Sequence, residues 1–170
     1  RIAITDGMAP NAVKHLEDSG HEVVLGFIAK ADLLAGALTG YDAVIIRSAT
    51  KMSAEIIAAN PNLKVIGRAG VGVDNIDLDA ATQQGIPVVN APTGNTIAAT
   101  EHTLALMLAL ARHIPQAHQS MTSNEWRRRE FQGIELRHKT LGVVGLGKVG
   151  SEVARRAQAF QMNILAYDPY

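Results

Sequence analysis

The stretch TLGVVGLGKVGSEVARRAQAF, residues 140–160, decides how this sequence is interpreted. Its three glycines at the spacing Gly-x-Gly-x-x-Gly are Gly145, Gly147 and Gly150. The apolar run LGVV just before them predicts a buried strand, and the pattern at about 149–160 predicts a helix. A chain with 15 glycines in 170 residues can produce this spacing by accident. Asp168, at the end of the next expected strand (NILAYDP), completes the context of a dinucleotide-binding turn.

Each part of this turn has a physical role. The three glycines permit, in chain order, a tight turn, a close approach of the backbone to pyrophosphate, and close packing of the helix on the strand. The helix N-terminus offers N–H groups and a positive dipole to the phosphates. Asp168 would accept hydrogen bonds from ribose hydroxyls and repel a 2′-phosphate, which favours NAD over NADP. The predicted NAD-binding residues here are Gly145, Gly147, Lys148, Val149, Gly150 and Asp168.

Short β-rich runs alternate with helical patterns over the first half of the chain. Strands are expected at 1–5, 21–26, 43–48, 64–69 and 87–91. Helices are expected at about 10–18, 30–38, 53–59 and 77–84. This alternation predicts βαβ units, and therefore a flavodoxin-like α/β domain with a parallel sheet and helices on both faces.

A long helix is expected next, at about 95–119, with Asn95 as its N-cap. A polar segment with a basic cluster follows, and a second α/β unit opens at about residue 139. Two strands cannot bury both faces by themselves, so this second unit reads as the first βαβ unit of a Rossmann domain. The expected division of the chain is 1–92, 93–138 and 139–170.

Composition limits the possible functions. The chain has 16 basic and 16 acidic residues, so no overall charge favours nucleic acid or an anionic membrane. It has no cysteine, which excludes disulfides and thiolate chemistry and is compatible with a cytoplasmic location. The apolar run 97–111 is interrupted by Glu101 and His102, and we expect a buried helix there rather than a membrane span.

Several motifs together resemble the D-2-hydroxyacid dehydrogenases. These are RSATKMS (47–53), VIGRAGVGVDNIDLDAATQQGIPVVNAPTGNT (65–96), the long helix, EWRRREF (125–131) and KTLGVVGLGKVGSEVA (139–154), in the family's order. The resemblance covers essentially the whole chain. It implies that 1–92 is a substrate-binding domain without its C-terminal return segment, that 93–138 connects, and that 139–170 starts the NAD-binding domain. The implied reaction is NAD-dependent oxidation of a C2 hydroxyl in the cleft between the domains.

The resemblance also assigns substrate-binding residues in the first domain. The loop GRAGVGVDN follows a strand, and its amides around Val71 and Gly72 would hold the substrate carboxylate, with Val71 also near the nicotinamide. Arg47 and Arg68 end apolar strands, where guanidinium groups suit a phosphorylated hydroxy acid. The alternative for both arginines is a surface ion pair, with Asp42 or Asp74.

The basic segment EWRRREF has two interpretations. A solvated charged face is the simpler one. The resemblance instead places Arg128 where it reaches across a dimer interface toward the neighbour's substrate phosphate. Trp126 and Phe131 are expected in interface or core packing, and the chain is expected to form a dimer or tetramer through the cofactor domain and long helix.

No catalytic residue is expected within this chain. Oxidation of an alcohol needs a base, and the family's histidine, its carboxylate partner and an orienting arginine all lie beyond the second strand of the nucleotide domain. The six histidines here carry no such motif, and no metal site is predicted. We therefore expect an N-terminal part of a longer dehydrogenase, inactive by itself. The alternatives are a dehydrogenase for glycerate, lactate or glyoxylate, and an NAD(H)-sensing co-regulator of the C-terminal-binding-protein type.

Overall fold

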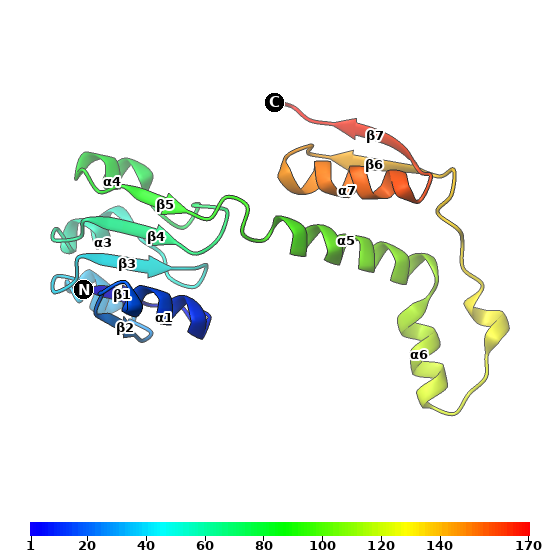
Figure 1. Cartoon of the computed structure of the whole chain (residues 1–170), viewed down its shortest axis with the longest axis horizontal. Coiled ribbons are helices and arrows are strands. Elements are labelled where there is room, and N and C mark those ends of the chain that lie inside the picture. The colour runs from blue at the N-terminus through cyan, green and yellow to red at the C-terminus, as the bar shows by residue number, and fades with distance from the viewer. The chain divides into compact units, whose positions relative to one another are not determined.

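Five parallel strands form the sheet of the first unit, Arg1–Gly94, in the order β2-β1-β3-β4-β5 (Figure 1). The computed structural model describes all residues from Arg1 to Tyr170. The strands are β1 Ile2–Ile4, β2 Val23–Leu25, β3 Ala43–Ile46, β4 Val65–Arg68 and β5 Val88–Asn90. The helices between them are α1 Pro10–Asp18, α2 Lys30–Leu34, α3 Ala54–Ala59 and α4 Leu78–Gln83. This strand order confirms the flavodoxin-like α/β domain.

The alternating side chains of these strands build two cores. Ala3, Val44 and Ile66 point toward α2, α3 and α4, where they belong to a cluster of fully buried aliphatic side chains. Ile2 and Ile4 point to the opposite face and pack with Val13 of α1. Both faces therefore carry helices, as the alternation of strands and helices predicts, but three cover one face and one covers the other.

Asn60, directly after α3, is a polar residue with no exposed surface in the larger core. Its Oδ1 accepts from the Leu38 N–H at 2.7 Å, and its Nδ2 donates to the carbonyls of Leu33 at 2.9 Å and Ile56 at 2.7 Å. One amide thus satisfies three buried backbone groups, which belong to α2, to α3 and to the turn that follows α2.

The second unit, Asn95–Tyr170, contains a two-stranded parallel sheet. Its strands are β6 Thr140–Val144 and β7 Asn163–Tyr167, and its helices are α5 Thr96–Ala111, α6 Ile114–Thr122, the 3-10 helix η1 Arg128–Phe131 and α7 Lys148–Ala159. Helix α7 packs on one face of the strands, and α5 packs on α7 (Figure 1). Val144, Leu165 and Tyr167 remain exposed on the sheet. This is the βαβ unit expected from the sequence.

The prediction of one long helix at 95–119 is wrong, because the helix ends at Ala111 and a second one begins at Ile114. Pro115 has no N–H to donate to the carbonyl of Ala111, four residues earlier. His113 adopts a left-handed conformation with φ 52°, which turns the chain between the helices. The Ala111 carbonyl accepts instead from the N–H of Ile134 at 2.9 Å. The proline and this returning segment together explain the break.

The expectation that 97–111 is a buried helix is also wrong for this chain. Leu106 is 58% exposed and Leu110 is 77% exposed, and Ile97 is exposed as well. The helix has apolar residues around its whole circumference, and α7 covers only part of it. None of the helices combines the length and the apolar character that a membrane span requires.

We predict that Asn60→Ala lowers the free energy of unfolding by about 3 kcal/mol. The substitution leaves three buried backbone groups without hydrogen-bond partners and opens a cavity. Urea unfolding followed by circular dichroism measures this change. Asn62→Ala is the matched control, since Asn62 is exposed and donates one hydrogen bond, to the Thr39 carbonyl. Equal losses in the two variants would contradict the role assigned to Asn60.

Candidate functional site

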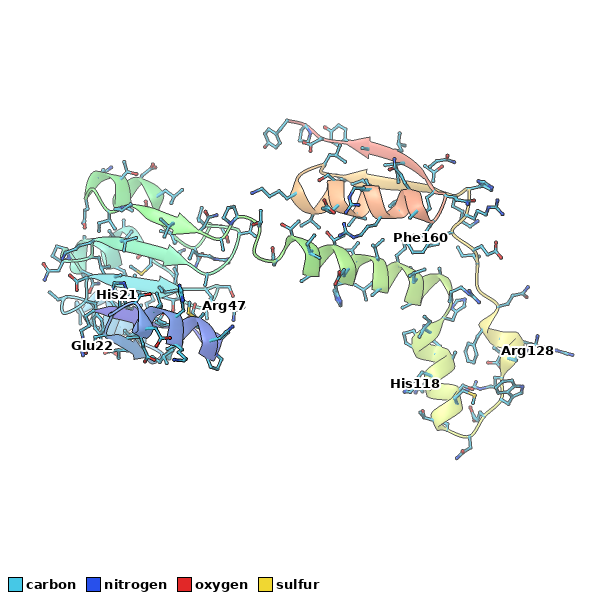
Figure 2. All side chains as sticks on the ribbon, in the orientation of Figure 1. His21, Glu22, Arg47, His118, Arg128 and Phe160 are labelled. Carbon is cyan, nitrogen blue, oxygen red and sulfur yellow. The ribbon has the colours of Figure 1, made fainter.

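The carboxyl ends of β3 and β4 bring the predicted substrate residues of the first unit to one edge of the sheet. Ile46 pairs with Arg68, and Arg68 pairs with Asn90 of β5. Arg47 directly follows β3 on the same edge, where Figure 2 labels it. Open parallel sheets bind ligands at this edge, beyond their carboxyl ends.

Arg68 is half-buried and carries no ion pair within the chain. Its Nε is buried without a hydrogen-bond partner. The guanidinium of Arg68 occupies the space that a side chain at position 70 would need, and Gly70 leaves this space open. A buried donor without an acceptor is costly, so this arginine is suited to an anionic ligand.

Arg47 is exposed, and its Nη1 donates only a long bond of 3.4 Å, to the Gly7 carbonyl. The alternative ion pairs for the two arginines are not formed. Asp42 binds Lys64 Nζ at 2.7 Å instead. The hydrogen bond from Lys64 lowers the pKa of Asp42 below its usual value. Neither Arg47 nor Arg68 is therefore neutralised by a carboxylate.

The glycine-rich loop after β4 carries Val71 and Gly72. Asn90 Nδ2 donates to the Val71 carbonyl at 2.6 Å, and the Ala91 N–H donates to the Gly70 carbonyl at 3.0 Å. These bonds hold the carbonyl side of the loop, while the N–H groups of Val71 and Gly72 donate to no group of the chain. The arrangement leaves two successive amide donors for an anion such as a carboxylate.

A buried carboxylate, Asp6, lies just beyond β1 and was missed by the sequence reasoning. It accepts hydrogen bonds from the Arg47 N–H at 2.6 Å, the Thr50 N–H at 3.1 Å and the Thr50 hydroxyl at 2.7 Å. Burial raises the pKa of Asp6, but the bonds from Thr50, Arg47 and Ala49 outweigh it and lower the pKa below its usual value. The sequence did contain a signal for Asp6. It follows the expected strand 1–5, and the carboxyl end of that strand lies at the same edge as the carboxyl ends of strands 43–48 and 64–69.

The glycine turn of the second unit has the geometry that its spacing predicts. Gly145 has φ 91°, which only glycine adopts without strain, and its N–H donates to the Tyr167 carbonyl at 2.7 Å. A side chain on Gly150 would collide with the Gly145 carbonyl, whereas one on Gly147 would meet nothing within 4 Å. The turn is therefore tight, α7 packs closely on it, and the backbone at Gly147 is open to a ligand.

Asp168 lies beside this turn, because its Oδ2 accepts from the Leu146 N–H at 2.6 Å. Lys148 and Val149 form the first turn of α7, which contains no acidic residue. A hollow of about 480 Å³ lies along the turn and is lined also by Thr103 of α5. A helix N-terminus for phosphates and a carboxylate for ribose hydroxyls thus occur in one place, and these residues fit a dinucleotide.

Arg128 lies on η1 in the second unit, as Figure 2 shows. Its neighbour Arg127 pairs with Glu125 at 2.6 Å and Glu130 at 3.2 Å, whereas Arg128 and Arg129 form no ion pair in the chain. Together with Arg112 they line a hollow of about 740 Å³. The basic cluster therefore keeps uncompensated charge that an anion can approach.

The aromatic residues of this segment differ in burial. Trp126 is 77% exposed, which excludes core packing within this chain, and Phe131 is partly buried.

No acid–base pair is formed by the histidines. The side chains of His15, His21, His102, His113, His118 and His138 make no hydrogen bond or ion pair. No group of three or more histidine, cysteine or carboxylate residues could hold a metal ion. Within the described chain, the residues can bind anions and a dinucleotide, but none is placed as a general base.

Comparison with known proteins agrees with this geometry. The sequence model of a protein family, the D-isomer specific 2-hydroxyacid dehydrogenase catalytic domain, matches residues 2–166 of this chain. A D-3-phosphoglycerate dehydrogenase of Archaeoglobus fulgidus is 52% identical over the whole chain, which covers 32% of that protein. The chain thus spans about a third of the length of the curated relatives it matches.

Solved structures show the same fold. The TT0316 protein from Thermus thermophilus is 34% identical with a TM-score of 0.92, and the match covers 100% of this chain and 56% of that one. An NAD⁺-bound 3-phosphoglycerate dehydrogenase of Entamoeba histolytica is 36% identical with a TM-score of 0.76, covering 99% of this chain and 53% of that one.

We predict that Gly150→Ala lowers the free energy of unfolding of the second unit by about 2 kcal/mol or more, because the new methyl group displaces α7 from the turn. Denaturant unfolding followed by circular dichroism measures it. Gly142→Ala, in β6, is the control, since a methyl group there meets nothing within 4 Å and should cost less than about 0.5 kcal/mol. Unchanged stability of Gly150→Ala would show that the close packing is not required.

Proposed function

This chain belongs to the D-isomer specific 2-hydroxyacid dehydrogenase family, and from that premise we propose that its gene product oxidises D-3-phosphoglycerate with NAD. The product would be 3-phosphohydroxypyruvate, and the reaction would be the first step of serine biosynthesis. The observation that carries the substrate assignment is the pair of arginines, Arg47 and Arg68, at adjacent strand ends without carboxylate partners. A doubly charged phosphate beside a carboxylate suits this pair and the loop amides.

The chain's own residues have separable roles in this proposal. The N–H groups of Val71 and Gly72 hold the substrate carboxylate and so orient the C2 carbon. Arg47 and Arg68 hold the phosphate, and Arg128 of a second copy approaches the same phosphate. Each is a binding role, because none of these groups takes the hydroxyl proton.

NAD binding is proposed at the glycine turn of the second unit. Gly145, Gly147 and Gly150 shape the turn, and the amides of Lys148 and Val149 face the pyrophosphate at the start of α7. Asp168 takes the ribose hydroxyls, which favours NAD over NADP. Val71 lies near the nicotinamide in this proposal. NAD bound at this turn would supply the hydride acceptor for the reaction, and no residue of 1–170 is proposed as the base that takes the proton.

The decisive experiment measures NADH formation by the full gene product with D-3-phosphoglycerate, D-glycerate and D-lactate, each with NAD and with NADP. We expect kcat/KM to be highest for D-3-phosphoglycerate with NAD, and the 170-residue chain to show no turnover. Arg68→Gln should lower kcat/KM about a hundredfold, since charge-assisted hydrogen bonds to phosphate are lost.

Arg137→Gln is the matched control, because Arg137 is exposed and bonded to Gln161 in the second unit. Preference for D-lactate or D-glycerate would assign another hydroxy acid. NAD(H) binding without turnover of any substrate would favour the co-regulator function. Turnover by the 170-residue chain would contradict the absence of a catalytic base.

A homo-oligomer is proposed from the exposed apolar side chains of the second unit. Leu106 and Leu110 of α5 and Trp126 are exposed, and association of two copies would remove this apolar area from water. A cytoplasmic location remains a prediction from the sequence.

We predict that the full gene product sediments as a dimer or tetramer at micromolar concentration, and that Leu110→Glu shifts it toward smaller species, because a carboxylate cannot be buried there without a partner. Sedimentation velocity measures both. Glu101→Gln on the same helix is the control, and an unchanged distribution for Leu110→Glu would exclude α5 as the interface.

A further inference from the structure

Both peptide groups that flank Arg47 are held by side chains from distant segments. Its N–H donates to Asp6 Oδ2 at 2.6 Å, and its carbonyl accepts from Asn75 Nδ2 at 2.6 Å. Asp6 follows β1, and Asn75 closes the glycine-rich loop that follows β4. The backbone of this one arginine is therefore fixed from two sides.

The same two side chains also hold Thr50, at the other end of the turn 47–50. Asp6 accepts from the Thr50 N–H at 3.1 Å and hydroxyl at 2.7 Å, and Asn75 donates to the Thr50 carbonyl at 2.6 Å. The hydroxyls of Thr50 and Thr5 are 2.8 Å apart, and both residues are buried. The turn is clamped at both ends, and we refer to Asp6 and Asn75 as the clamp residues.

Asn75 holds the turn through its amide nitrogen alone. Both of its partners are carbonyl oxygens, so the nitrogen of Asn75 must face them. Its Oδ1 is then left buried without a partner. Burying an unpaired acceptor costs free energy, so the net stabilisation from Asn75 is smaller than its two hydrogen bonds alone would give.

The side chain of Arg47, by contrast, is weakly held. It is exposed, has no carboxylate partner and makes one long contact with the Gly7 carbonyl. The position of its guanidinium therefore depends on the direction in which the backbone of the turn projects it. Because Asn75 belongs to the same loop as Val71 and Gly72, the clamp also links this arginine to the two amide donors.

We propose that Asp6 and Asn75 are positioning residues that fix Arg47 relative to the amides of Val71 and Gly72, so that phosphate and carboxylate are bound at a set separation. This inference rests on the proposed function. A ligand with both groups gains from the clamp because its site is organised before binding.

The test compares Asp6→Asn and Asn75→Asp in the full gene product. Asp6→Asn removes the negative charge and one of the two acceptor oxygens that the donors of the turn use. Asn75→Asp removes the amide nitrogen that donates to the Arg47 and Thr50 carbonyls. We expect each to raise KM for D-3-phosphoglycerate about tenfold and to change kcat and the Kd for NADH less than about twofold. In an Arg47→Ala background, neither substitution should raise KM further, because the group that it positions is absent.

Asn62→Asp is the matched control, since Asn62 also donates one side-chain bond to a backbone carbonyl but lies before β4, away from this edge. It should leave KM unchanged. Effects on KM that persist undiminished in the Arg47→Ala background would overturn the proposal. The proposal would also be overturned if kcat and the affinity for NADH fell by as much as KM rises, or if both clamp variants lost the native circular dichroism. Either result indicates a general structural role. Absence of turnover in the unmodified protein would instead refute the proposed function.

Discussion

The parallel pairing of β3 with β4, from Ala43 opposite Val65 to Ile46 opposite Arg68, is the constraint on which the substrate side depends. It brings residues more than twenty positions apart in the sequence to one edge of the sheet. Because parallel strands share this edge, the turn after β1, the turn after β3 and the loop after β4 become neighbours. The hydrogen bonds of Asp6 and Asn75 then tie these three connections together, and Asn90 ties the loop after β4 to β5.

The second unit follows a similar logic with a different kind of contact. There the pairing of β6 with β7 places Asp168 beside the glycine turn, and the absence of a side chain at Gly150 lets α7 approach. Side-chain amides hold the glycine-rich loop of the first unit. In the second unit, glycine residues shape the turn because they carry no side chain. Each solution leaves backbone N–H groups at the place where an anion is expected.

Much of this arrangement could be predicted from the sequence, because local patterns determine it. The alternation of strand and helix runs predicted the five-stranded parallel sheet, and Gly145, Gly150 and Asp168 predicted the turn. The break of the long helix was not predicted, because Pro115 is tolerated in the first turn of a second helix and the partner of the Ala111 carbonyl, the N–H of Ile134, is distant in the sequence. Asp6 and Asn75 were missed because their importance comes from contacts between distant residues.

The break after Ala111 also has a consequence for how the chain can vary. The Ala111 carbonyl binds the N–H of Ile134, and Gly133 lies against it where no side chain would fit. The two ends of the segment 112–133, which includes α6 and η1, are thereby fastened to each other. A loop with fastened ends can gain or lose residues at a small entropic cost without moving what flanks it. The segment that carries Arg128 can therefore change in length while the bond between Ala111 and Ile134 stays in place.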